Sequence, residues 1–160
     1  ESHMVAEALA APITFGKSHH NAITANVNVA DLALQPVTKT RNRLLDAITS
    51  SDPWQRYWAC IACSVIGPSA RELVDHVRPL LKDNHPLVRV RAAEFLGSIQ
   101  AAYPMPTLYD VLNKLESEQE LMLTFNTVVY PRDFRGHSFD TTRLKLKFDG
   151  APIVQVKTNI

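Results

Sequence analysis

Cysteine, net charge and long apolar runs are all scarce in this sequence of 160 residues. Two cysteines so close together in the chain cannot form the disulfide framework of a small secreted domain, so cysteine usage leaves the redox compartment open. Seventeen Lys and Arg residues against sixteen Asp and Glu residues give a net charge of +1, which favours neither nucleic acid nor an anionic membrane as a partner. The sequence has no run of about 18 apolar residues that could span a bilayer.

The sequence does contain enough apolar material, 46% of its residues, to bury a core in one domain or a compact array. Residues 1–4 read ESHM, which is typical of a cloning-vector remnant and not of a signal peptide. We therefore expect the chain to be an excised piece of a longer protein.

Apolar residues recur at helical spacing from Asp31 onward, in short segments separated by proline and polar residues. Helices are therefore predicted to dominate. The predicted apolar stripes are Leu44, Leu45 and Ile48; Trp58, Ile61, Ala62 and Val65; Leu73, Val74, Val77, Leu80 and Leu81; Val88, Ala92, Phe95, Leu96 and Ile99; Leu108, Val111, Leu112 and Leu115; and Leu121, Phe125, Val128 and Val129.

The predicted helix boundaries have a chemical basis. Pro53 and Pro86 each stand where a first helical turn needs no amide donor, and Gly67 is placed to end a helix. Ser69 and Glu72 have the spacing of a capping box, in which the hydroxyl and the carboxylate each accept a hydrogen bond from an amide of the first turn.

An internal repeat of 33 residues is the most informative feature. The offset that places Pro53 on Pro86 also places Arg56 on Arg89. The superposed positions that follow are Ala59 and Ala92, Cys60 and Ala93, Cys63 and Leu96, and Ile66 and Ile99. Helix pairs at about this period are typical of an α-solenoid, in which neighbouring units stack into one continuous core. We predict an all-α array over residues 31–134.

The two ends of the chain differ from this array. Residues 5–30 have weak periodicity and mixed turn residues, so we expect an irregular or short helical lead-in. In residues 135–160, apolar residues alternate with Arg143, Lys145 and Lys147, and a turn follows at Asp149. This pattern predicts a small extended or β-hairpin tail.

The stretches "SDPWQRYWACIACSVIG" and "KDNHPLVRVRAAEFLGSI" resemble HEAT repeats. Together with "LTFNTVVYPRDF", they resemble the HEAT-repeat C-terminal region that follows the catalytic domain in bacterial sulfatase-like proteins, over roughly residues 31–150. The resemblance implies a short right-handed stack of antiparallel helix pairs. It also implies a periplasmic or secreted parent that hydrolyses sulfate esters with a formylglycine nucleophile and calcium. None of those catalytic residues is present to be carried over.

The pair Cys60 and Cys63, followed by Pro68, Ser69 and Arg71, could indicate a redox pair, a metal half-site or a degraded sulfatase signature. In that signature the proline stands two positions after the cysteine, whereas Pro68 stands five after Cys63. A redox pair needs its first cysteine at a helix start, and a metal site needs further ligands. We therefore interpret both cysteines as buried apolar thiols.

Other polar and aromatic residues allow a structural and a functional interpretation. Arg56 and Arg89 could bind anions, but we favour structural bonds to an acidic turn, at Asp52 or Asp83. The histidines are His3, His19, His20, His76, His85 and His137, and we interpret them as surface or loop residues and not as metal ligands.

The aromatic cluster of Trp54, Tyr57 and Trp58 is interpreted as inter-helix packing, with a partner-binding hot spot as the alternative. The last third of the chain is locally basic and could bind a sulfated glycan, although charges that keep an exposed edge soluble are the favoured interpretation. The basic residues and the histidine are Arg132, Arg135, His137, Arg143, Lys145, Lys147 and Lys157.

These features predict a non-catalytic scaffold or interaction module, with no metal or cofactor of its own, that packs against a sulfatase-like domain of the same chain. The rivals are a free-standing protein-binding adaptor and a HEAT-like enzyme of the DNA glycosylase or bilin lyase type. A net charge of +1 argues against the glycosylase. The apolar residues of the lead-in are expected to contact the missing domain, or else to fold over the end of the array as its cap. These residues are Ile13, Phe15, Ile23, Val27 and Val29.

Overall fold

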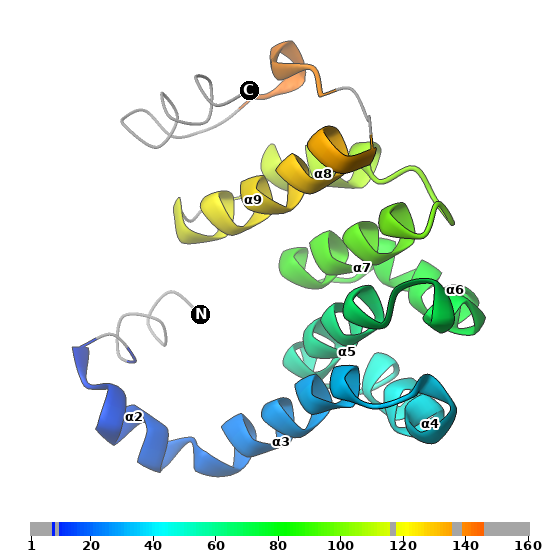
Figure 1. The fold of residues 1–160 in the computed structure, drawn as a ribbon. Coiled ribbons are helices and arrows are strands. Elements are labelled where there is room, and N and C mark those ends of the chain that lie inside the picture. The colour runs from blue at the N-terminus through cyan, green and yellow to red at the C-terminus, as the bar shows by residue number, and fades with distance from the viewer. Residues whose placement is uncertain (1–7, 9, 116–117, 136–138, 146–160) are drawn as a thin grey trace.

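The computed structural model describes residues 8, 10–115, 118–135 and 139–145, and these are helical or irregular, with no strand among them. Helices α3 (His20–Ala30), α5 (Pro53–Ile66), α7 (Pro86–Ser98) and α9 (Glu118–Arg135) form one layer, in which each contacts the next (Figure 1). A second layer is made by α4 (Val37–Ile48), residues 67–82 and α8 (Met105–Leu112). The predicted all-α solenoid is confirmed.

The four helices of the first layer begin 33, 33 and 32 residues apart, so the period extends upstream of the repeat that the sequence shows. For residues 5–30 the sequence allowed an irregular or a short helical lead-in. The irregular alternative is wrong where the chain is described. Residues 12–30 form α2 (Pro12–Ser18) and α3, and α3 is the first member of the stack. Its apolar stripe is weak because only one flank, facing α5, is covered; none of its residues is fully buried.

Residues 67–82 do not form one regular helix. They form η2 (Gly67–Leu73), α6 (Val74–Val77) and η3 (Arg78–Lys82), where η denotes a 3₁₀ helix. Gly67 ends α5 at a φ of 67°, as predicted, and Pro79 lacks the amide that a continuous helix needs. The predicted capping box is wrong: η2 has no side-chain cap, and Glu72 instead accepts a hydrogen bond from Arg41.

The predicted stripes lie mostly in the core. Every member of the α7 stripe and of the α8 stripe is buried. In α5 the face is partly wrong: Val65 is 64% exposed, whereas Tyr57 and Ala59 are buried. Because α3, α7 and the second layer all cover α5, its buried arc is wider than one stripe. Helix α7 also approaches the start of α8 closely, since a Cβ on Gly97 would lie 2.8 Å from Pro104 Cγ.

The C-terminal end of the stack is covered by residues 139–145, which contain η4 (Thr141–Arg143) and lie beyond α8 and α9, opposite α2 (Figure 1). Phe139 stacks on Tyr109 of α8 with 5.0 Å between ring centroids, and the Arg143 guanidinium lies 4.3 Å from the same ring. The Asn113 amide accepts a hydrogen bond from Lys145 N and donates one to Arg143 O.

The extended or β-hairpin tail was predicted over residues 135–160, of which residues 136–138 and 146–160 lie outside the described part of the chain, and Arg135 is the last residue of α9. Residues 139–145 contain a 3₁₀ turn and no strand. No helix in the described residues is long and apolar enough to cross a membrane.

Candidate functional site

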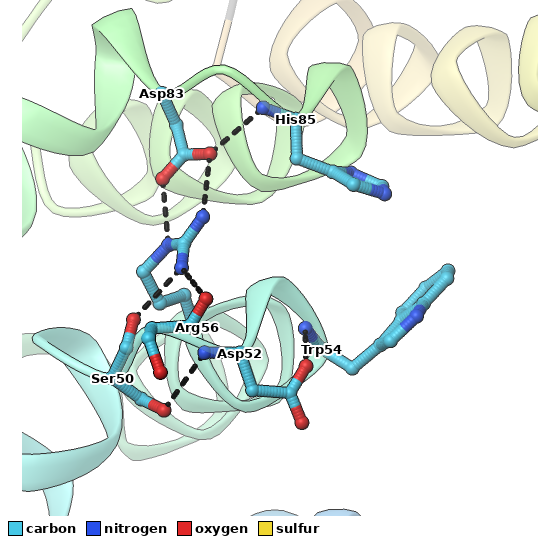
Figure 2. A network of polar contacts seen from close by, with 7 residues as sticks. Ser50, Asp52, Trp54, Arg56, Asp83 and His85 are labelled. Carbon is cyan, nitrogen blue, oxygen red and sulfur yellow. Dashed lines mark hydrogen bonds and ion pairs between the residues drawn. The ribbon is translucent and has the colours of Figure 1, made fainter.

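The start of α5 is built around Asp52, Pro53 and Arg56. The Asp52 carboxylate accepts a hydrogen bond from the Trp54 amide at 2.9 Å and so caps the helix, and Pro53 occupies the first turn as predicted. The Arg56 side chain then turns back along the helix, where its Nη1 donates to the carbonyl oxygens of Ser50 and Ser51. Arg56 thereby fixes the loop that joins α4 to α5 (Figure 2).

The same guanidinium binds the turn before α7. Its Nε and Nη2 donate to the two oxygens of Asp83 at 2.7 and 2.9 Å, and Asp83 also accepts from the His85 amide. Burial alone would raise the pKa of Asp83, but the hydrogen bonds from Arg56 and His85 outweigh it and hold that pKa below its ordinary value. The bond to Asp83 raises the pKa of Arg56. The predicted structural pairing is confirmed, with Asp83 as the partner and Asp52 as a cap.

Arg89, at the equivalent position of the next unit, finds a different partner. Its Nη2 donates to Asp110 of α8, a residue that the sequence did not indicate as a partner. The Asp110 side chain is 41% exposed and shares its charge with Lys114. Hydrogen bonds from Lys114 and Arg89 lower the pKa of Asp110, despite a smaller opposing effect of burial. Arg89 lines two open surface pockets of about 410 and 340 Å³.

A comparison with protein families identifies the array to which these contacts belong. A family profile described as HEAT repeats matches residues 41–120, half of the chain. The chain belongs to the HEAT-repeat family. Neither the curated proteins nor the solved structures gave a match. The array is thus a helical scaffold of the kind that HEAT repeats build.

The aromatic residues of the HEAT array pack between units, as predicted. The Trp54 ring meets Tyr57 and His85 edge to face, at centroid distances of 5.7 and 5.2 Å. Tyr57 is buried with Leu87 and Val88, although Trp54 stays partly exposed. His85 lies in the loop before α7, as predicted, but it is buried and not on the surface, and its ring contacts Trp54.

Arg91 is the polar residue that the sequence analysis missed. It lies on α7 and binds Tyr57 of α5, Glu94 of its own helix and Thr127 of α9. Burial would lower the pKa of Arg91, but Glu94 and Tyr57 together raise it. The alternating sequence "VRVR" could have indicated this role for Arg91, because a charged residue between apolar residues of a core helix requires partners.

Two further arginines bind backbone carbonyl groups, one at the end of α7 and one in the turn that follows it. Nη2 of Arg71 donates to Ile99 O at 2.7 Å, and Nη2 of Arg78 donates to Ala101 O. Carbonyl groups at a helix C-terminus lack partners within the helix and attract cations. Arg71, which looked like part of a degraded sulfatase signature, therefore caps the helix of the next unit.

The two cysteines are free and fully buried. Burial raises the pKa of Cys60 well above its ordinary value and that of Cys63 to about 12, so both are neutral thiols near pH 7. Their predicted burial in the apolar core is confirmed. In the described part of the chain, no group of three or more His, Cys, Asp and Glu residues could hold a metal ion.

The basic residues near the C-terminus are only partly visible. Lys145 and Arg143 are exposed, and the Arg143 guanidinium stacks on Tyr109. Arg132 and Arg135 belong to α9, but their side chains lie outside the description, as do His137, Lys147 and Lys157 altogether. Their convergence on one face stays a prediction.

Proposed function

We propose that this HEAT array is the non-catalytic scaffold of a sulfatase-like protein, and that it packs against the catalytic domain of the same chain. The parent is then a sulfuric ester hydrolase of the periplasm or of the secreted fraction, and formylglycine and calcium belong to its catalytic domain. The proposal rests on the resemblance of "DPWQRYWAC", "PLVRVRAAEFLG" and "LTFNTVVYPRDF" to the region that follows such domains.

One structural observation supports the scaffold role. The partly buried arginines Arg56, Arg89 and Arg91 each bond to a neighbouring helix or turn, so their charges stabilise the stack. Arg56 and Arg89 were the candidate anion ligands of the array. Because both are paired with Asp83 and Asp110, they stabilise the array itself, as expected of a rigid scaffold that binds a partner domain.

The test is to read the gene upstream of this segment for a Cys-x-Pro-Ser-Arg motif and to assay the full protein and the isolated array on an aryl sulfate. We expect turnover by the full protein and none by the array. An Asp83→Asn change should lower the melting temperature of the full protein without changing kcat per folded molecule. Turnover by the array that is lost on Cys63→Ala would contradict the proposal, and an upstream frame without the motif would favour a free-standing adaptor.

A sulfated glycan is a second proposed partner, for the exposed basic residues at the covered end. Arg143 and Lys145 supply two of the charges. Binding to a sulfated oligosaccharide should weaken with salt and on Lys145→Ala, with Lys17→Ala at the far end as the matched control. Equal loss with both variants would indicate only a general attraction of charge.

A further inference from the structure

Residues 139–145 form a short strap that contacts the C-terminal end of α8. Within this strap Phe139 and Leu144 are partly buried, and the other residues whose burial is described are exposed. The two hydrogen bonds between the strap and Asn113 are also exposed to solvent. A segment with few buried contacts and solvent-exposed hydrogen bonds opens more readily than the core of a fold. We therefore expect the strap to open while α8 stays folded.

The surface beneath the strap binds it through main-chain atoms. The Asn113 side-chain amide, at the end of α8, accepts a hydrogen bond from Lys145 N at 2.6 Å and donates one to Arg143 O at 3.1 Å. The Tyr109 hydroxyl accepts a third hydrogen bond, from Asp140 N. Main-chain bonds of this kind give a peptide affinity and register that do not depend on its side chains. We call Tyr109 and Asn113 the strap site.

Three side chains of the strap add selectivity. The Phe139 ring stacks on the Tyr109 ring with 5.0 Å between centroids, and the Arg143 guanidinium lies 4.3 Å from the same ring. Leu144 packs on the apolar cluster that includes α8. The strap site therefore favours an aromatic residue that is followed, four and five positions later, by an arginine and an apolar residue.

The shape of the strap is determined by its own sequence. The Asp140 carboxylate accepts hydrogen bonds from the Thr142 amide at 2.9 Å and from the Thr142 hydroxyl at 2.7 Å, and Asp140 O accepts one from Arg143 N. An aspartate that binds the backbone two residues further on makes a local turn. A peptide with the same turn can present its aromatic residue and its arginine to Tyr109 in the same way, whichever chain carries it.

We propose that the strap site is a peptide-binding site and that the strap is its autoinhibitory occupant. The partner is a segment of another protein with the chemistry of residues 139–145: an aromatic residue, an Asp-x-Thr turn, an arginine and an apolar residue. It binds only when the strap has opened, because both need the same ring and the same amide. This inference goes beyond the proposed function and does not depend on a sulfatase parent.

Fluorescence polarisation with a labelled peptide of sequence FDTTRLK tests the proposal on the whole chain. Phe139→Ala weakens the strap, so this variant should bind the peptide about ten times more tightly than the unmodified chain, in which the strap competes. Phe15→Ala is the matched control, because Phe15 is also a partly exposed ring, stacked on His19, but lies on α2 at the other end. It should bind the peptide no better than the unmodified chain does.

A second variant tests the site itself. Adding Asn113→Ala to Phe139→Ala should remove the gain, because the amide that binds the peptide backbone is lost; melting curves check that both variants fold. Equal binding by Phe139→Ala and the unmodified chain overturns the proposal, and so does equal binding of a scrambled peptide. If light scattering shows a doubled mass for the unmodified chain that Phe139→Ala reduces to that of one chain, the occupant is the strap of a second copy, which overturns a partner from another protein.

Discussion

The two ends of the array differ in how they meet solvent. At the C-terminal end, residues 139–145 return to α8, where Tyr109 and Asn113 bind them through ring stacking and backbone hydrogen bonds. At the N-terminal end, α3 packs on α5 with one flank and leaves Ile23 and Val27 exposed on another. Since the helices of a solenoid bury their faces on their neighbours, a terminal helix needs either a cap or a partner. One end of this chain has a cap within the described residues, and the other carries an uncharged apolar face.

Thiol labelling at equivalent repeat positions should show the largest difference. Val27 stands 33 residues before Cys60, yet Val27 is half exposed and Cys60 is buried. In a Cys63→Ala background, a Val27→Cys thiol should react on the order of a thousand times faster than Cys60. Cys60 reacts only when the stack opens, and opening a core helix costs several kcal/mol. Similar rates would show that α5 opens as readily as α3.

Truncating one side chain at each end gives the next largest difference. Tyr109→Ala should lower the free energy of unfolding by about 4 kcal/mol, because it removes a buried aromatic ring and the stacking contact with Phe139. Ile13→Ala should change it by less than about 0.5 kcal/mol, because Ile13 is exposed. Urea unfolding measures both. A small effect of Tyr109→Ala would mean that the covered end contributes little stability.

The two equivalent arginines provide a third comparison, within the array. Asp83→Asn should destabilise the fold by about 2 kcal/mol, since the partly buried Arg56 loses its charged partner. Asp110→Asn should cost less than about 1 kcal/mol, because the Asp110 carboxylate is 41% exposed and screened by water. Urea unfolding of both variants measures the two losses in the free energy of unfolding. Equal losses would show that the two ion pairs contribute alike.

Acid is expected to destabilise the fold in part by protonating Asp83. The pKa of Asp83 is lower in the folded chain than in the unfolded chain, so its pairing with Arg56 stabilises the fold above the unfolded value of about 4. That contribution is lost as the pH falls through the folded pKa. The free energy of unfolding should therefore decrease more between pH 5 and pH 2 in the unmodified chain than in Asp83→Asn. Parallel pH profiles would assign acid sensitivity to other carboxylates.

The smallest expected effect is a gain at the open end. Asn26 stands at the repeat position of Ala59 and Ala92, and its Oδ1 is buried without a hydrogen-bond partner among the described residues. Asn26→Ala should raise the free energy of unfolding by about 0.5 kcal/mol, because an unsatisfied polar atom is removed and alanine favours helix. A loss of similar size would mean that the Asn26 amide has a partner in solution.

The sequence predicted best where a helix is covered on both sides. In α7 all five residues of the predicted stripe are buried, and Pro53 and Pro86 begin their helices. It predicted worst at α3, where covering one flank leaves a faint periodicity, and at Ser69, whose capping motif is not used. Asp83 was one of the two partners predicted for Arg56. The sequence did not predict Asp110 as the partner of Arg89.

The 33-residue period, the proline positions and the small residues at Ala59 and Ala92 are local properties, so the sequence alone determined the solenoid, its unit length and the burial of both cysteines. The partner of each arginine and the face of each terminal helix depend on which segments meet across the stack. Arg56 reaches a turn and Arg89 reaches a helix, although their local sequences are alike. Only the tertiary structure decided those contacts, because an ion pair forms according to distance in space and not according to spacing along the chain.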